Sequence, residues 1–136
     1  MSCGCIAMGV CDLAFENGLF FAREIGHISA DDAKHWAESL LHCAKSSPVP
    51  IVILIDALHA TSISTEARRI FALASETPNV RIAAIATSNM LVEQQSRMTA
   101  LMCSVRHSHD THIFRTFEEA EQFAVSHLAP TVSYTG

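Results

Sequence analysis

The chain has 136 residues, of which 49% are hydrophobic, and it carries a formal net charge of −5. This length and composition indicate one globular domain over residues 1–136, with flexible ends at 1–4 and 129–136, and exclude a disordered chain. No segment gathers enough Lys or Arg to neutralise a row of phosphates, and no apolar run approaches the roughly 18 residues of a membrane span. Neither nucleic acid nor a membrane is therefore expected as a partner.

The amino-terminal sequence gives an expectation about the cellular compartment. It has no basic segment, long apolar run or small-residue cleavage pattern of the kind found in signal peptides, which favours the cytoplasm. The cysteines are odd in number and lack the spacing of a disulfide framework, so free thiols are expected, and no cofactor is expected. They are Cys3, Cys5, Cys11, Cys43 and Cys103. A soft-metal or redox role for the Cys-Gly-Cys segment stays open as an alternative.

The first half of the chain predicts a hairpin, a helix and a strand. Residues 5–24 indicate an antiparallel hairpin, because two apolar runs flank Asn17-Gly18, a strong hairpin-turn signal. Ser29 and Asp32 have the spacing of a capping box at the start of a helix whose apolar positions recur every three or four residues. Residues 51–56, IVILID, form a continuous run typical of a central parallel strand that is covered on both faces.

The second half alternates between helices and strands. A helix is expected from about Thr65 to Ser75, followed by a buried strand over residues 80–87. Ser88 is expected to cap a third helix, and residues 111–115 predict a short last strand. This order indicates an α/β fold: a mostly parallel β-sheet of about five strands, with an N-terminal antiparallel hairpin and four helices.

The third and fourth helices have recognisable patterns of their own. Large side chains of the third helix fall at helical spacing and are predicted to face the core; exposed methionines would instead mark a docking or dimer face. These residues are Met90, Leu91, Gln94, Met98, Leu101 and Met102. Thr116 and Glu119 form a full capping-box pattern at the start of the fourth helix.

The element order and the segment VILIDALHATSISTEARRIFALA, residues 52–74, resemble the STAS domain, the SpoIIAA-like fold of bacterial anti-sigma-factor antagonists. The similarity is greatest to divergent STAS-like members. The flanking segments ENGLFFAREIGHISADDAKHWAESLL and HIFRTFEEAEQFAVSHL agree, so the resemblance covers roughly residues 12–128. It implies a non-enzymatic regulator that docks on a partner protein, with a homodimer as one arrangement of such a module.

The resemblance also implies a position for a regulatory switch. The family's phosphorylation motif, Asp-Ser-(Ser/Thr)-Gly, matches Ser64-Thr65-Glu66-Ala67 here. Thr65 therefore occupies the phosphoacceptor place, and Ser64 is the second candidate. The sequence departs from the motif at three positions, because Ser64 replaces Asp, Ala67 replaces Gly and Glu66 adds a negative charge.

Two interpretations of this region follow from the residues themselves. The segment after Asp56 is expected to be a short loop with four hydroxyl groups, on Thr61, Ser62, Ser64 and Thr65. Ser64 is the natural helix cap, but a helix start also favours an added or bound phosphate, and two arginines lie within one turn. These are Arg68 and Arg69.

Asp56 carries the alternative function. An acid at the carboxyl end of a buried strand lies where α/β sheets place ligands. A small-ligand domain that holds an anion, nucleotide or lipid around Asp56 and Thr65 is therefore the alternative to partner docking. A structural hydrogen bond from Asp56 to the next loop is the simpler interpretation of the same residue.

The segment RHSHDTH contains three histidines, His107, His109 and His112. Histidine is a common ligand of transition metals, but no fixed zinc spacing is present. A solvated loop before the last strand is the preferred interpretation, and no metal is expected.

Overall fold

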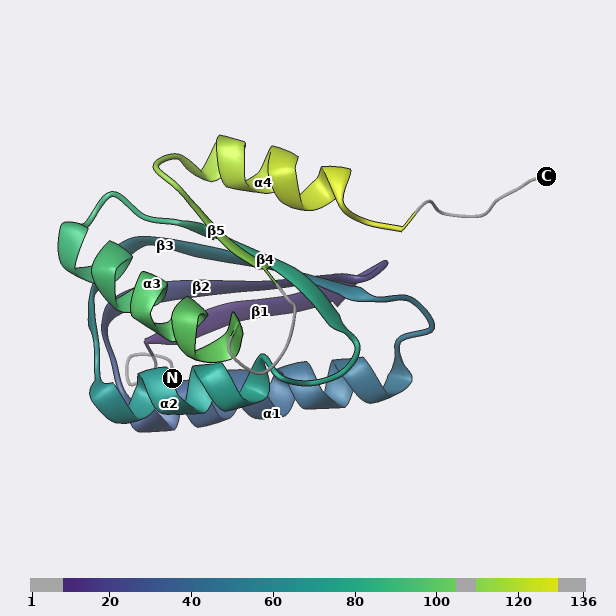
Figure 1. The fold of residues 1–136 in the computed structure, drawn as a ribbon, viewed down its shortest axis with the longest axis horizontal. Helices are drawn as coiled ribbons and strands as arrows, with labels where there is room; N and C mark the ends of the chain where they lie inside the picture. Colours follow the sequence, from purple (N-terminus) through teal and green to yellow (C-terminus); the bar gives the residue numbers. More distant parts are fainter. Residues whose placement is uncertain (1–8, 105–109, 130–136) are drawn as a thin grey trace, which may run out of the picture.

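The computed structural model describes residues 9–104 and 110–129, with the backbone alone given for 102–104 and 110 (Figure 1). Strands and helices follow one another in the order that the sequence predicts. The strands are β1 (Val10–Glu16), β2 (Leu19–Ile28), β3 (Ile51–Ile63), β4 (Val80–Ala86) and β5 (Asp110–Phe114). The helices are α1 (Ala30–Ser46), α2 (Thr65–Ala74), α3 (Met90–Ser104) and α4 (Phe117–Ser126).

The five strands form one sheet in the order β1-β2-β3-β4-β5. β1 and β2 are antiparallel, and every later pair is parallel. Asn17 and Gly18 turn the chain with φ values of 53° and 87°, which a two-residue hairpin turn of the type favoured by Asn-Gly requires. The predicted fold class and the predicted hairpin turn are both confirmed; residues 5–8 of the predicted hairpin lie outside the described residues.

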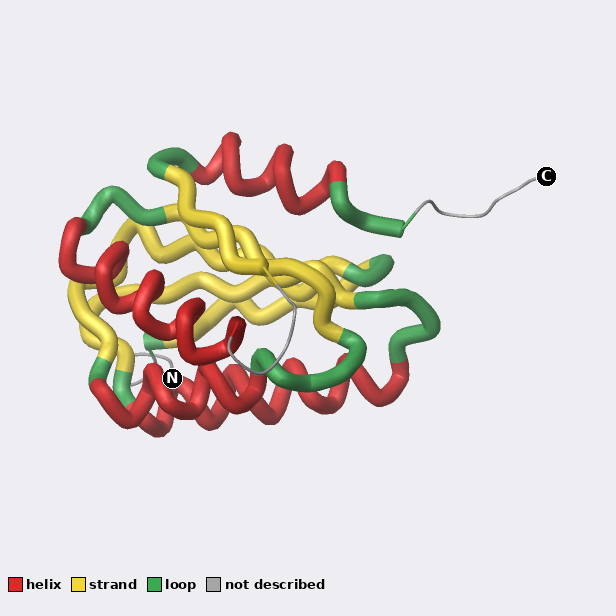
Figure 2. The backbone as a smooth tube through the Cα atoms, viewed as in Figure 1, coloured by secondary structure: helices red, strands yellow, loops and turns green. Residues whose placement is uncertain are grey.

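Helices cover both faces of the sheet, as Figures 1 and 2 show. Helices α1, α2 and α3 lie on one face, and α4 lies alone on the other. The first seven residues of β3, Ile51 to Ala57, are all buried, because this central strand has a helical layer on each side. The prediction of a central strand covered on both faces is therefore confirmed.

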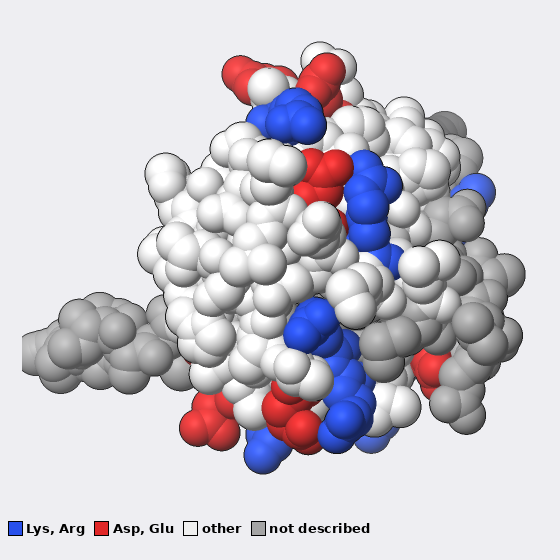
Figure 3. Space-filling view, turned by 60° about the vertical axis from the view of Figure 1, so that its left-hand side comes forward, with Lys and Arg blue, Asp and Glu red and all other residues white. Residues whose placement is uncertain are grey.

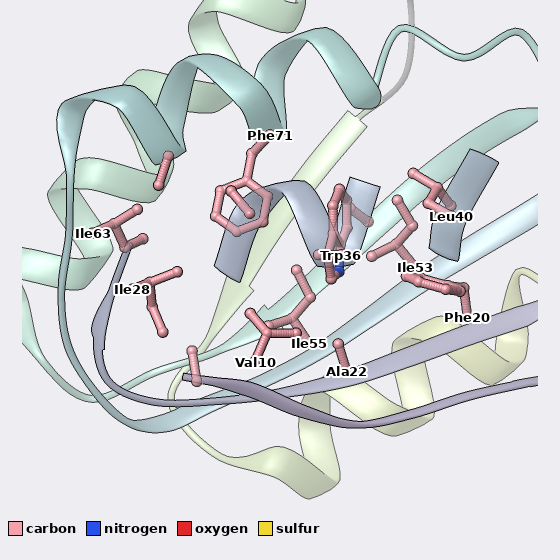
Figure 4. Packing of buried hydrophobic residues seen from close by; sticks show 14 of the residues in the cluster. Val10, Phe20, Ala22, Ile28, Trp36, Leu40, Ile53, Ile55, Ile63 and Phe71 are labelled. Carbon is pink, nitrogen blue, oxygen red and sulfur yellow. The ribbon is translucent and has the colours of Figure 1, made fainter. Parts of the chain in front are cut away.

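An aromatic group centres the core on the α1–α3 side. Trp36 of α1 packs edge-on against Phe20 of β2 and Phe71 of α2, with ring centroids 5.7 and 4.9 Å apart. Figure 4 shows Phe71 and Trp36 above Ile55 of the central strand, with Ile53 between Trp36 and Phe20. Burial of such large rings supplies much of the apolar area that joins α1 and α2 to the sheet.

The strand that contains Asp56 is longer than the sequence predicts. β3 continues to Ile63, so the expected loop after Asp56 is wrong, and Thr61 and Ser62 lie within a strand. The cause is the length of β2, which reaches Ile28 and supplies hydrogen-bonding partners beyond the level at which β4 stops. The pairs of this extension are Ile25 with His59, Gly26 with Ala60, His27 with Ser62 and Ile28 with Ile63.

Two predicted capping boxes have different outcomes. At α1 the box is confirmed: Ser29 Oγ accepts from the Asp32 backbone N–H at 3.2 Å, and Asp32 Oδ2 accepts from the Ser29 N–H at 2.8 Å. At α4 half of it forms, because Thr116 Oγ1 accepts from the Glu119 N–H at 3.2 Å. The Glu119 carboxylate instead accepts from the Thr116 hydroxyl at 3.2 Å.

The start of α3 differs from the prediction by one residue. Asn89, and not Ser88, caps the helix, since Asn89 Oδ1 accepts from the Val92 backbone N–H at 3.0 Å. Thr87 Oγ1 accepts from the Asn89 N–H at 3.2 Å and holds the cap in place. Asn and Ser are comparably good caps, so the sequence alone does not decide which of the two caps the helix.

The face of α3 that packs on the sheet is the opposite of the predicted one. The buried residues are the small ones, Val92 and Ser96, while Met90 and Met98 are 75% and 54% exposed. Small side chains let the helix lie close to the sheet, and the large apolar side chains then point outward. Within the part of the chain that the structure describes, no helix is both long and apolar enough to cross a bilayer.

Candidate functional site

The first turn of α2 is built by Ser64. Its backbone is extended, and its Oγ accepts from the Ala67 backbone N–H at 3.0 Å, so Ser64 is the N-cap and that interpretation is confirmed. The Arg68 N–H donates to the Ser64 carbonyl at 3.0 Å as the first helical hydrogen bond. The side chain of Ser64 is thus committed to the helix start, and the next residue presents the accessible hydroxyl.

Thr65 is exposed, and an arginine lies against its hydroxyl group. Arg68 Nη2 donates to Thr65 Oγ1 at 3.0 Å, and Arg68 Nη1 lies 3.8 Å from Met98 Sδ of α3. The Arg68 Nε atom is buried and has no hydrogen-bond partner among the described residues. The guanidinium therefore sits between the two helices with one donor uncommitted, beside the hydroxyl that the resemblance singles out.

Arg69 and Glu66 form a neighbouring ion pair. Arg69 Nη1 lies 3.1 Å from Glu66 Oε1, one turn apart on the same helix. Both side chains are exposed, so the pair contributes little to stability. Its consequence is electrostatic: Arg69 balances the charge that Glu66 adds beside Thr65, and Arg68 has no ion-pair partner among the described residues.

A groove of about 370 Å³ runs between α2 and α3. Its walls combine cationic, hydroxyl and apolar side chains: Thr65, Arg68 and Arg69 from α2, and Met98 and Leu101 from α3. The view of Figure 3 shows a face of mainly uncharged surface, with separate groups of Lys and Arg within it. A surface of this composition suits a partner with both apolar and acidic groups.

Exposed apolar side chains concentrate on the two helices that form this groove, and two of them, Met98 and Leu101, line it. Of the eight large hydrophobic residues that are exposed in the described part of the chain, five belong to α2 and α3. They are Leu73, Met90, Leu91, Met98 and Leu101. We refer to Thr65, Arg68, Arg69, Met90, Met98 and Leu101 as the α2–α3 surface. Clustered apolar side chains, methionines above all, are typical of surfaces that other molecules cover.

Asp56 does not join this surface. It lies on the sheet face that α4 covers: Arg23, its ion-pair partner, lies over the ring of Phe21, and Phe21 packs against Phe117 of α4. The prediction of one ligand site around Asp56 and Thr65 is therefore wrong, because the sheet separates the two residues. Nor is Asp56 at a strand end, since β3 continues for seven residues beyond it.

The contacts of Asp56 are structural. Its Oδ2 accepts from Arg23 Nε at 3.2 Å, and its Oδ1 accepts from the Leu58 backbone N–H at 3.2 Å. The hydrogen bond to Asp56 is the largest of the effects that raise the pKa of Arg23, whose Nη1 also lies 2.6 Å from Asp12 Oδ2. The simpler interpretation of Asp56, a hydrogen bond to the segment that follows it, is confirmed.

Thr61 and Ser62 lie on the extension of β2 and β3, away from the groove between the helices. Ser62 Oγ and His27 Nδ1 form a hydrogen bond of 2.5 Å across the two strands. The predicted site residues therefore divide into three groups. The structure brings Thr65, Arg68 and Arg69 together with α3, after Ser64 as the helix cap. It leaves Thr61 and Ser62 on the strand extension and places Asp56 on the opposite face.

The predicted histidine and cysteine features are described in part. His107, His109, Cys3 and Cys5 lie outside the described residues, as does the side chain of Cys103. His112 is exposed on β5 and packs against Phe123, with ring centroids 4.6 Å apart. Within residues 9–101 and 111–129, no three His, Cys, Asp or Glu side chains come together as metal ligands.

The two cysteines whose side chains are described, Cys11 and Cys43, are free and half-buried. Burial is the main effect that raises the pKa of each thiol. A raised pKa keeps the thiols protonated at neutral pH, and the thiol is a much weaker nucleophile and metal ligand than the thiolate.

Glu24 is a titratable residue that the sequence interpretation missed. It is 3% exposed on β2 and points to the α1–α3 side with Phe20 and Ala22. Burial raises the pKa of Glu24 to about 7, and the charge of Asp32 adds to the effect. The signal was present, because Glu24 follows Phe20 and Ala22 at the spacing of two that marks one face of a strand.

No protein-family model and no curated protein match the sequence. Two solved structures share its fold. An uncharacterized protein of the DUF3478 family with a SpoIIAA-like fold, from Shewanella loihica PV-4, has a TM-score of 0.62 and 16% identity over 85% of this chain and 94% of that chain. An anti-sigma factor antagonist from Mycobacterium paratuberculosis has a TM-score of 0.58 and 13% identity over 85% and 92%. The chain therefore has the SpoIIAA-like (STAS) fold, as the resemblance implies.

Proposed function

We propose that the chain is a cytoplasmic, non-enzymatic regulatory module that docks on a partner protein through the α2–α3 surface. The observation that carries the proposal is the exposure of Met98 and Leu101 beside Arg68 and Arg69 around one groove. Exposing such a cluster to water is unfavourable, and a partner that covers it gains the apolar area and meets the arginines with its own acids. The fold it shares with an anti-sigma factor antagonist supports the same assignment.

Phosphorylation of Thr65 is the regulatory part of the proposal. A phosphate on Thr65 Oγ1 would accept hydrogen bonds from Arg68, whose guanidinium already contacts that atom at 3.0 Å. The phosphate would then draw Arg68 away from Met98 and change both the charge and the shape of the groove. Peptide mass spectrometry of the chain from its native cells tests this step, and an unmodified Thr65 in every growth state contradicts it.

The docking proposal is tested by photo-crosslinking in the native cells. A photoreactive amino acid replaces Met98 in one variant and Val125 in a matched control. Val125 is also an exposed apolar residue, 52% accessible, but it lies on α4 across the sheet. We expect one defined protein to crosslink at position 98 and not at 125, and Leu101→Asp to abolish that product.

Two outcomes would contradict partner docking. Equal crosslinking at positions 98 and 125 would show that the α2–α3 surface is not selective. A crosslink at position 98 to a second copy of this chain alone would assign the surface to a homodimer; sedimentation of wild type and Leu101→Asp would then measure its dissociation.

A further inference from the structure

A cavity of about 50 Å³, partly open to solvent, lies between the sheet and helices α1, α2 and α3. Its walls are mainly apolar, with side chains such as Ile53, Ile55 and Phe71. Two groups of a different kind also line it: the carboxyl group of Glu24 from β2, and the indole of Trp36 from α1. The cavity is thus an apolar space with an acceptor and a donor on its wall.

The Trp36 N–H lacks a partner among the described residues. The Nε1 atom of Trp36 is buried and has no hydrogen bond to any described residue, and the Trp36 side chain is 1% exposed. Glu24 is 3% exposed, and burial and the charge of Asp32 are the two causes of its raised pKa. Figure 4 shows the Trp36 ring on edge beside Ile53, within this layer. Buried polar groups are almost always satisfied by protein or by ordered water, so the Trp36 N–H requires an occupant of the cavity, and the same occupant lies within reach of the Glu24 side chain that lines it.

The size of the cavity decides what that occupant is. A space of about 50 Å³ is small for an aromatic or nucleotide ligand, since an engineered cavity known to bind benzene measures about 150 Å³. It is large enough for water, which needs roughly 10–15 Å³ measured in the same way. Water also has the right chemistry, because one molecule accepts from the Trp36 N–H while the same or a second one donates to the Glu24 carboxyl.

The charges around Glu24 oppose its ionisation. Asp32 faces it from α1, and although burial opposes ionisation there too, backbone hydrogen bonds from Ser29, Gly9 and Val10 and one from the Ser29 hydroxyl lower the pKa of Asp32. Asp32 therefore stays charged and repels a second negative charge nearby. Arg23, the cation next to Glu24 in the chain, points to the other face of the sheet, where its guanidinium contacts Asp12 and Asp56.

Among the described residues, the other elements that line the cavity bring no charge that would offset this repulsion. β1 pairs Val10 with Glu24, β3 to β5 contribute apolar residues and Thr111, and α2 and α3 contribute Phe71, Ser75, Ser96, Thr99 and Ala100. Glu24 is thus the one titratable side chain among the described residues that line the cavity. The protonated carboxyl group is neutral and is compatible with these surroundings. The ionised carboxylate meets only uncharged side chains among the described residues that line the cavity.

We propose that the cavity is a hydrated proton-sensing site, in which water joins Glu24 to the Trp36 N–H and loss of the Glu24 proton to solvent loosens the packing of α2 and α3 on the sheet. The carboxylate draws more water into the space beneath α2 and α3, which these helices line with Phe71 and with small or polar side chains. Any consequence for docking rests on the proposed function, whereas the proton site itself does not.

Trp36 is the one tryptophan in the chain, so tryptophan fluorescence reports on the cavity that Trp36 lines. Emission of the full chain is followed from pH 5.5 to 8.5. We expect a transition with its midpoint at about pH 7 in wild type and none in Glu24→Gln, because a carboxylate beside an indole changes its emission. Glu38→Gln is the matched control, since Glu38 is exposed on the same helix as Trp36 and its removal should leave the transition intact.

A flat wild-type titration, or the same transition in Glu24→Gln, overturns the proposal; the second result assigns the change to histidines. If Glu24→Gln does not fold, carbon NMR of the glutamate carboxyls in wild type gives the answer directly. The resonance of Glu24 must then titrate near neutral pH, and a midpoint near its ordinary value overturns the proposal. Faster amide exchange in α2 and α3 at pH 8 than at pH 6, corrected for intrinsic rates, tests the loosening, and equal protection contradicts it. None of these measurements needs the partner, so they succeed or fail independently of the docking function.

Discussion

The two faces of the sheet satisfy their polar groups to different degrees. On the α4 side, small residues such as Ala120 and Ala124 pack tightly against Val52 and Leu54, and the acid on that face, Asp56, has both a cation and a backbone donor. The α1–α3 side instead keeps a cavity that Glu24 and Trp36 line, and both the Trp36 Nε1 and the Arg68 Nε are buried without a partner among the described residues.

This difference locates function within the fold. A fully satisfied layer has no polar group left to recognise anything, and its mutations are expected to change stability alone. Unsatisfied donors and exposed apolar side chains lower stability, so their concentration on one side marks the groups that act on other molecules or on protons. We therefore propose that the functional groups lie on the α1–α3 side and that the α4 side is structural.

The largest expected effect concerns the pH dependence of stability. The pKa of Glu24 is higher in the folded chain, at about 7, than in the unfolded chain, so the folded state binds the proton more tightly in the interval between the two values. Its contribution to stability is complete below the unfolded pKa and is lost as the pH rises to about 7. The whole loss is about 3 kcal/mol, of which about 2 kcal/mol falls between pH 5 and pH 8.

Urea denaturation at pH 5 and pH 8 measures this loss in wild type, Glu24→Gln and Glu38→Gln. Glu24→Gln should remove the decline, and Glu38→Gln should keep it. Asp32 acts with the opposite sign, because its pKa is lowered and its stabilisation disappears only in more acidic solution. If the free energy of unfolding of Glu24→Gln still falls between pH 5 and pH 8, the pH dependence does not come from the cavity, and the proposed difference between the two faces of the sheet is contradicted.

Most of the fold follows from hydrophobic pattern and turn chemistry. The Asn17-Gly18 turn and the capping box at Ser29 are local signals, and the structure contains both. The extension of β3 beyond Asp56 is not local, because it depends on the length of β2, a strand more than thirty residues earlier. A break in the apolar pattern at Asp56 therefore looks like a strand end in sequence, although pairing with β2 carries the strand on.

The site was less predictable than the fold for a related reason. α3 has two stripes at helical spacing, one of large apolar residues that includes Met98 and one of smaller residues that includes Val92 and Ser96. Hydrophobic periodicity favours burial of the large stripe. In the structure the small stripe is buried, because small side chains let the helix lie close to the sheet. Only the three-dimensional packing decides which stripe is buried, and therefore whether α3 has an exposed apolar face.

A smaller effect is expected from breaking the satisfied acid on the α4 side. Asp56→Ala removes a partly buried ion pair and the hydrogen bond to the Leu58 N–H, which we expect to cost about 2 kcal/mol. Chemical denaturation measures this loss. Trp36 emission against pH and crosslinking at position 98 should both match wild type, because the sheet separates Asp56 from the cavity and from the groove. A change in either would show that the two faces are coupled.

The smallest effect separates the roles of two adjacent hydroxyl groups. Ser64→Ala removes the N-cap of α2 and should lower the free energy of unfolding by about 1 kcal/mol. Thr65→Ala removes an exposed hydroxyl that accepts one hydrogen bond from the Arg68 guanidinium, so its effect should stay below about 0.5 kcal/mol. Equilibrium urea curves of the two variants, taken side by side, measure the difference.

The functional consequences of the same two substitutions should be reversed. If the switch operates at Thr65, Thr65→Ala abolishes the phosphate on this segment and fixes the crosslinking pattern of the unmodified state, while Ser64→Ala keeps the phosphate on a slightly less stable helix. A phosphate that persists in Thr65→Ala and disappears in Ser64→Ala would instead place the acceptor at the cap. That result would require the Ser64 hydroxyl to leave the Ala67 N–H, so the helix start would have to reorganise at each cycle of the switch.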